Sequence, residues 1–135
     1  MSELVIKAEL DRLDEVIAFI DSCLEEHECP MKTQMQIDLS VEELFVNICH
    51  YSYTPSNGDA RITFGFEPDA HKAVITFDDT GIPFDPVARP DPDVNAPAAE
   101  RQIGGLGIYM VKKSMDDMKY LFRDGHNIVT IEKAF

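Results

Sequence analysis

The segment at residues 103–108, Ile-Gly-Gly-Leu-Gly-Ile, decides the fold that we expect for this sequence. Glycines at the start of a helix leave backbone N–H groups open to bind phosphate, and the helix dipole assists them. The segment is not a P-loop, because no Gly-Lys-Ser/Thr follows it. It also lacks the third glycine of a dinucleotide fingerprint, since Met110 stands there. Taken alone, it is equally compatible with a flexible loop or a helix cap.

A second segment lies upstream, at residues 78–86, with the sequence Asp-Asp-Thr-Gly-Ile-Pro-Phe-Asp-Pro. It follows a hydrophobic strand, and an aspartate at a strand end can accept a hydrogen bond from an exocyclic amine such as adenine N6. Gly81 lies two residues after Asp79 and lets the backbone approach a flat ring closely. For this segment alone, an ordinary Asp-x-Gly turn is the better interpretation.

A third polar group is the pair Glu43 and Asn47, which are four residues apart on a predicted helix. That spacing places both side chains on one helix face. The amide oxygen of Asn47 can bind Mg²⁺, and the carboxylate of Glu43 can accept a proton from a hydroxyl group or water. The alternative is that both side chains only solvate an exposed face. Strongly apolar neighbours favour a position close to the sheet.

Composition limits the possible functions of this chain of 135 residues with a net charge of −13. One domain with one core is expected at this length. The negative surface argues against binding nucleic acid or anionic lipid. We expect a cytoplasmic protein, because no apolar run could span a membrane, no signal peptide is apparent, and the cysteines fit reduced thiols. The three cysteines are Cys23, Cys29 and Cys49.

Hydrophobic periodicity predicts the order β-α-α-β-β-loop-α-β-β. We expect strands near residues 4–8, 60–67 and 72–78, and helices over 12–27 and from 31 to about 53. A third helix runs to about residue 115, and a hairpin closes the chain over residues 119–132. The fold class is therefore α+β, a two-layer sandwich of a mixed, mainly antiparallel sheet with helices on one face. The proline-rich stretch at about residues 83–105 is expected to be a lid.

The three segments, taken in order, resemble the N, G1 and G2 boxes of the GHKL ATPase/kinase superfamily. The matching residues are Glu43-x-x-x-Asn47, Asp79-x-Gly81 and Gly105-x-Gly107. Gyrase, histidine kinases and MutL share that ATP-binding (Bergerat) fold. The sequence is most similar to the branch of anti-sigma-factor serine-protein kinases, on the strength of residues 81–86 and 104–111. The similarity extends from the first helix to the closing hairpin.

The resemblance implies ATP and Mg²⁺ as cofactors and assigns roles residue by residue. Glu43 corresponds to the general base, Asn47 to the magnesium ligand, Asp79 to the adenine-binding aspartate, and Gly81 to the glycine behind the base. The phosphate-binding end of the lid corresponds to Gly104, Gly105, Leu106, Gly107 and Ile108. Thr130 matches a threonine that supports the adenine-binding aspartate, although an ordinary strand threonine is an equally fair interpretation.

Two features depart from the family pattern. Members often carry a histidine eight residues after the N-box glutamate, but Tyr51 stands there and His50 precedes it. Arg101 is the only basic residue after Arg89 in the expected lid, and we regard a contact between Arg101 and the γ-phosphate as the minority interpretation.

The resemblance implies a serine-protein kinase that phosphorylates a STAS-type anti-sigma antagonist and also binds a sigma factor. It further implies a homodimer formed through the N-terminal strand and first helix. The alternative is a nucleotide-gated protein-binding regulator without kinase activity. A detached catalytic domain of a histidine kinase is a third and weaker possibility.

Overall fold

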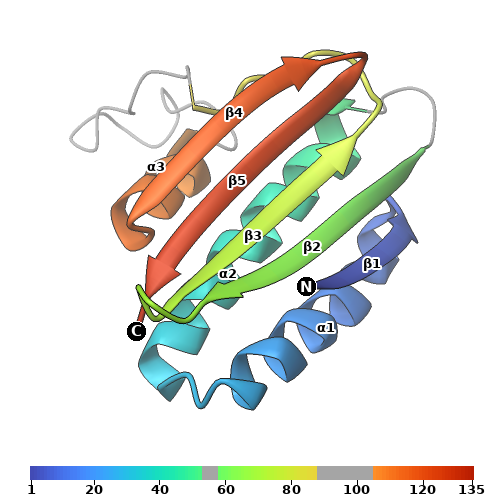
Figure 1. Ribbon diagram of the computed structural model, residues 1–135. Coiled ribbons are helices and arrows are strands. Elements are labelled where there is room, and N and C mark those ends of the chain that lie inside the picture. Colours follow the sequence, from blue (N-terminus) through green and yellow to red (C-terminus); the bar gives the residue numbers. More distant parts are fainter. Residues whose placement is uncertain (53–57, 88–104) are drawn as a thin grey trace.

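The structure is a two-layer α+β sandwich, seen in a computed structural model that describes residues 1–52, 58–87 and 105–135. Three α-helices cover one face of a five-stranded sheet (Figure 1). In chain order, the elements are β1 (Ser2–Lys7), η1 (Leu10–Arg12), α1 (Leu13–Glu26), α2 (Met31–Asn47), η2 (Ile48–Ser52), β2 (Asp59–Glu67), β3 (Lys72–Asp79), α3 (Gly105–Ser114), β4 (Asp117–Arg123) and β5 (His126–Ala134).

The sheet has the strand order β1-β2-β3-β5-β4, and each pairing among the described strands is antiparallel. Side chains of a strand alternate between the two faces, so every second residue of β3 and β5 is buried beneath the helices. The predicted α+β class with helices on one face is therefore confirmed. The central strand β3 ends at Asp79, which is buried although it carries a carboxyl group.

Helix α2 lies between α1 and α3 and forms the centre of the helical layer. Its apolar positions recur at helical spacing, so Ile37, Val41 and Phe45 are fully buried against the sheet. Ile20 and Leu24 of α1 are buried in the same core. The helix that the sequence predicts to run from residue 31 to about 53 changes character at Ile48, where a π-helical turn begins. Such turns are frequent at functional sites.

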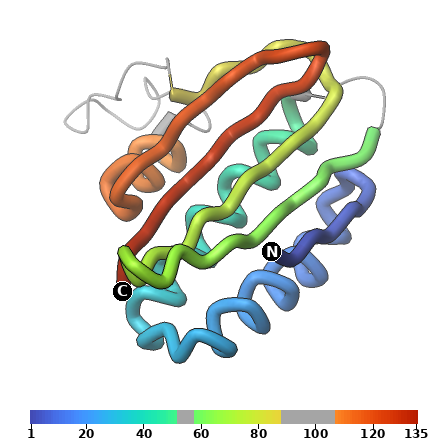
Figure 2. The backbone as a smooth tube through the Cα atoms, in the orientation of Figure 1, coloured from blue at the N-terminus to red at the C-terminus, as the bar shows by residue number. Residues whose placement is uncertain are grey.

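Several chain segments meet at one end of the sheet. Figure 2 shows the segment after β3 (yellow) passing beside the turn between β4 and β5, at the end of the molecule where α2 also ends. Asp79 is paired in register with Asn127 at the start of β5. In the described part of the chain, no helix is both long and apolar enough to cross a membrane.

An acidic pair lies between the first two helices. Burial, together with the adjacent carboxyl group of Asp21 on α1, raises the pKa of Asp38 on α2 to about 8, and the charge of Glu25 acts in the same direction. One oxygen of each of these two aspartates is buried and has no hydrogen-bond partner among the described residues. Asp38 therefore binds a proton in the folded protein at a pH where the unfolded chain has released it.

This proton makes folding stability depend on pH. Because the pKa of Asp38 is raised on folding from 3.8 to about 8, the free energy of unfolding should fall as the pH rises through that interval. Asp38→Asn should remove this dependence and raise the Tm at pH 8 by a few degrees. Thermal unfolding at several pH values measures both effects. Asp124→Asn is the control, because the Asp124 side chain is 90% exposed, and it should change neither the Tm at pH 8 nor its dependence on pH. A Tm of the parent chain that rises between pH 5 and 8 would contradict the prediction.

Candidate nucleotide site

Asp79 anchors the site at the end of β3. Its side chain is only 4% exposed, and its Oδ1 atom accepts a hydrogen bond from the backbone N–H of Gly81 at 3.0 Å. This bond closes the turn that leads out of the strand, as an Asp-x-Gly sequence favours. A second donor to the same oxygen, at 2.9 Å, is the side-chain amide of Asn127 on β5. The carboxyl group is thus fixed in orientation at the floor of the site.

Asn127 is the central residue of the site, and the sequence analysis missed it. Its Nδ2 atom also donates to the carbonyl oxygen of Ile82 at 2.8 Å, while its Oδ1 atom accepts from the backbone N–H of Phe84 at 3.1 Å and from the hydroxyl of Tyr120 at 2.6 Å. One buried amide therefore links β3, the segment after it, and β4. The signal that could have found it is the register of β5 against β3, which pairs Asn127 with Asp79.

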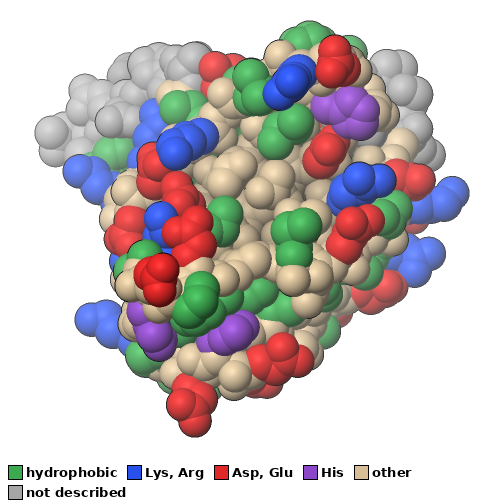
Figure 3. All heavy atoms as spheres, viewed as in Figure 1, with side chains coloured by type: hydrophobic (Ala, Val, Ile, Leu, Met, Phe, Trp, Pro, Cys, Tyr) green, Lys and Arg blue, Asp and Glu red, His purple; other side chains and the backbone are tan. Residues whose placement is uncertain are grey.

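The structure contradicts the predicted role of Thr130. Because side chains alternate along β5, Asn127 and Val129 point into the core whereas Thr130 points to the opposite face. Its hydroxyl lies 3.4 Å from that of Thr76 on the neighbouring strand. This open face, seen in Figure 3, has charged side chains mainly towards its borders and uncharged surface between them. Thr130 cannot reach Asp79 through the sheet, so Asn127 holds the aspartate in its place.

A narrow cavity lies beside Asp79, between the end of α2 and the sheet. Asn47, Phe77, Phe84 and Asn127 are among the residues that line it. Its free volume is about 20 Å³, roughly the room of one water molecule. A purine ring is much larger, so the segment that carries Phe84 has to shift outward before a base can lie against Asp79.

Tyr51 packs on that segment. Its ring is stacked on Phe84, with the centroids 5.0 Å apart and an angle of 11° between the rings. The π-helical turn at the end of α2 carries Tyr51, at the position where histidine is common in the family. His50 is exposed and its ring centroid is 6.2 Å from that of Tyr51. The departure from the family pattern therefore places an aromatic ring against Phe84, which lines the cavity.

Glu43 and Asn47 lie one turn apart on α2, on the side of the helix that faces the site. Asn47 is 5% exposed, and its Nδ2 atom has no hydrogen-bond partner among the described residues. Burial raises the pKa of Glu43, and the charge of Glu42 adds to the rise, while the nearby amide of Asn47 acts in the opposite direction. A carboxylate with a raised pKa is a better proton acceptor than an ordinary glutamate.

The first turn of α3 lies directly against Glu43. A β-carbon at Gly107 would overlap the carboxyl group at the end of the Glu43 side chain, so a larger residue there would displace this carboxyl group. Gly105 and Leu106 form the start of α3, and Ile108 is buried beneath it with 1% exposure. Gly104, Arg101 and most of the predicted lid lie outside the described residues.

The side chains fit an adenine nucleotide with Mg²⁺. A buried carboxyl group at Asp79 can accept from an amine, and the side-chain amide of Asn47, buried on α2, offers its oxygen to a cation. Carboxylate and amide oxygens are the ligands that Mg²⁺ prefers. The N-terminus of α3 adds backbone N–H groups close to Glu43, which suits a phosphate group in an acidic protein.

The fold and the site define a class of nucleotide-binding domain. The family model of the histidine kinase-like ATPase domain matches residues 6–133, and the chain belongs to this family. ATP binding is the property that this membership implies.

Particular relatives indicate one branch of the family. The chain is 26% identical over 95 residues to the serine-protein kinase RsbW of Bacillus cereus, a match that covers 67% of this chain and 58% of the relative. RsbW of Bacillus mycoides is 25% identical over the same length and with the same coverage. The chain thus spans less than two thirds of the curated relatives that it matches.

Solved structures share the fold. The RsbU and RsbW domains of a Mycobacterium tuberculosis protein superpose with a TM-score of 0.65 at 13% identity, over 99% of this chain and 32% of the other. The histidine kinase domain of a blue-light activated histidine kinase from Erythrobacter litoralis gives 0.58 at 15% identity, over 92% and 59%. At these identities the likeness is one of fold.

Replacement of Asn127 tests its place in the site. Asn127→Ala removes the donor to Asp79 and leaves buried polar groups unpaired, so we expect a loss of about 1–3 kcal/mol in the free energy of unfolding. ATP affinity should fall about tenfold, because the aspartate loses its fixed orientation. Calorimetric titration and denaturant unfolding measure the two effects. Thr130→Val is the control on the opposite face and should leave ATP affinity unchanged. Weaker ATP binding by Thr130→Val, with unchanged binding by Asn127→Ala, would restore the role predicted for Thr130.

The contact between Gly107 and Glu43 predicts a non-additive pair of substitutions. Alanine normally stabilises a helix by up to about 1 kcal/mol relative to glycine. Gly107→Ala should give less than this gain, because the new methyl group overlaps the Glu43 carboxyl group, which has to move aside. In a Glu43→Ala background the overlap is gone, and the same substitution should give the full gain. Denaturant unfolding of the four proteins measures this coupling, and equal effects in both backgrounds would disprove it.

Proposed function

We propose that this domain binds Mg-ATP and transfers the γ-phosphoryl group to a serine of a STAS-type anti-sigma antagonist. The observation that carries the proposal is the packing of the Glu43 carboxyl group against Gly107 at the N-terminal turn of α3. It brings a proton acceptor with a raised pKa next to backbone N–H groups suited to phosphate. The weak similarity to serine-protein kinases supports this choice of acceptor.

Each residue has a defined part in this proposal. Asp79 binds the amine of the adenine, and Asn127 keeps the carboxyl group of Asp79 in position. Asn47 holds Mg²⁺, which when bound neutralises charge on the phosphate groups. Glu43 takes the proton of the serine hydroxyl as that oxygen attacks. Phosphoryl transfer depends mainly on such positioning and electrostatic stabilisation, so this small set is sufficient.

Further parts of the proposal concern the lid and the assembly. Residues 83–105 would form the lid over the nucleotide, and a sigma factor would be a second partner. A homodimer would form through β1, which pairs only with β2 among the described strands and exposes 54% of Val5. Free strand edges of this kind readily pair with another chain. Light scattering in solution distinguishes the dimer from a monomer.

The second candidate is a nucleotide-gated binding regulator without transfer activity. The stack of Tyr51 on Phe84 favours it, because entry of a base has to displace this aromatic pair and so change the surface near the cavity. This candidate predicts partner capture that depends on nucleotide, with no phosphoserine formed.

Transfer of labelled phosphate tests the kinase proposal. With γ-labelled ATP, Mg²⁺ and STAS proteins from the same genome, we expect label on a serine of one partner. Glu43→Gln should lower the transfer rate about 10²- to 10⁴-fold and leave ATP affinity nearly unchanged. Because the reacting form of Glu43 is the carboxylate and its pKa is raised, the rate should increase with pH through that pKa.

An exposed glutamate outside the site provides a matched control. Glu67→Gln, at the end of β2, changes the net charge by the same amount and should retain most of the transfer activity. Equal losses in both variants would mean that charge, rather than the position of Glu43, matters. ATP binding without label on any partner would favour the binding regulator instead.

A further inference from the structure

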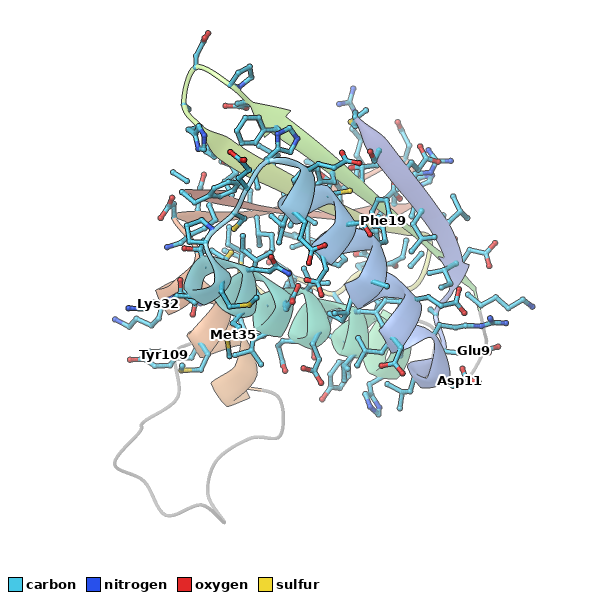
Figure 4. The ribbon with its side chains drawn as sticks, turned by 90° about the horizontal axis from the view of Figure 1, so that it is seen from below. Glu9, Asp11, Phe19, Lys32, Met35 and Tyr109 are labelled. Atoms are coloured by element: carbon cyan, nitrogen blue, oxygen red, sulfur yellow. The ribbon has the colours of Figure 1, made fainter. Side chains whose placement is uncertain are left out.

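An apolar surface on the helical layer is not used by the nucleotide site. Met31, Met35 and Leu39 follow one another at intervals of four residues along α2 and are 67%, 57% and 65% exposed. Residues at this spacing share one face of a helix. Met110 of α3 is 53% exposed, and Figure 4 shows Met35 on α2 and Tyr109 on α3 on the helical side of the molecule, away from the sheet. Large exposed apolar side chains that gather in this way mark interaction sites.

The surface leads into a groove between α2 and α3. The groove encloses about 400 Å³, and its lining includes Leu39, Val46 and Met110 as well as Glu42 and Glu43. It is twenty times larger than the cavity beside Asp79, since the two volumes are about 400 and 20 Å³. The groove is thus large enough to take a few side chains of a partner, and it has a carboxylate pair in its wall.

Glu43 and Asn47 of α2 line different hollows of the surface. Asn47 lines the narrow cavity with Asp79, whereas Glu43 and Gly107 line the groove. Four residues of helix separate Asn47 from Glu43, a distance of about 6 Å along the axis. A group that approaches Glu43 through the groove therefore does not pass through the cavity beside Asp79. The acceptor hydroxyl of a phosphoryl transfer has to reach the group that takes its proton, and the groove offers a route to Glu43.

Charge defines the partner further. Among the residues that line the groove, two are glutamates and none is lysine or arginine. The nearby cation Lys113 lies over the ring of Tyr109, 5.4 Å from its centroid. The whole chain carries a net charge of −13, so a basic partner is attracted and an acidic one repelled.

We propose that the groove between α2 and α3 docks the acceptor protein through a segment with apolar side chains and lysine or arginine beside its acceptor hydroxyl. This inference rests on the proposed transfer function and specifies the surface and the chemistry of its partner. The apolar side chains lie on Leu39 and Met110, and the basic side chain faces Glu42.

Binding can be tested without any transfer activity. The protein is labelled with ¹³C in its methionine methyl groups and titrated with a short synthetic peptide of leucine and lysine around one serine. We expect saturable shifts of the Met110 methyl resonance. The methyl resonance of Met1 should stay unchanged, because Met1 is 99% exposed and immediately precedes β1, outside the groove. A peptide with glutamate in place of lysine should give no shift. The same response to both peptides, or none at Met110, would overturn the proposal.

Kinetics with an unphosphorylated STAS protein that the domain phosphorylates provide the second test. Leu39→Glu and Met110→Glu, both at exposed positions, should raise the KM for the acceptor protein about tenfold with unchanged affinity for ATP. Leu121→Glu is the matched control, since Leu121 is 50% exposed on β4 and outside the groove. An unchanged acceptor KM in both groove variants would refute docking and leave the kinase proposal intact. Specific methyl shifts in a protein that transfers no phosphate would support docking and refute the kinase proposal.

Discussion

The hydrogen bonds of one amide, that of Asn127, hold the nucleotide site together. This side chain fixes the carboxyl group of Asp79 and ties down the segment through the carbonyl of Ile82 and the N–H of Phe84. A buried amide with both its oxygen and its nitrogen satisfied stabilises one geometry, whereas a half-satisfied one would be costly. The orientation of the Asp79 side chain therefore depends on the pairing of β3 with β5, because the residue that holds it lies on β5.

Helix α2 provides the second constraint. The apolar side chains of α2 are buried against the sheet, so Glu43 and Asn47 are held at a fixed distance from the strands. Gly107 then allows α3 to approach until its backbone reaches the carboxyl group of Glu43. The nucleotide side and the groove side are thus separated by a single turn of helix. A residue larger than glycine at position 107 would push the Glu43 carboxyl group out of this arrangement.

Much of the fold could be predicted from the sequence, because strands and helices follow the period of their apolar residues. The antiparallel sheet, the helices on one face and the positions of Glu43, Asn47 and Asp79 on their elements agree with the expectations from periodicity and resemblance. The assignment to a histidine kinase-like ATPase family is confirmed. The role predicted for Thr130 was wrong. Thr130 lies three residues after Asn127 on β5, and because side chains alternate along a strand, its side chain is on the other face of the sheet. The π-helical turn and the stack of Tyr51 on Phe84 depend on contacts distant in sequence, which periodicity does not report.

The hydrogen bond between Tyr120 and Asn127 extends the site to the edge of the sheet. Tyr120 belongs to β4, whose neighbouring residues Leu121 and Phe122 are 50% and 43% exposed. Thermodynamic linkage is reciprocal: an event at the edge strand that alters this bond changes nucleotide affinity, and nucleotide binding changes the edge by the same factor. A single phenol group thereby connects the outermost strand to the residue that orients Asp79.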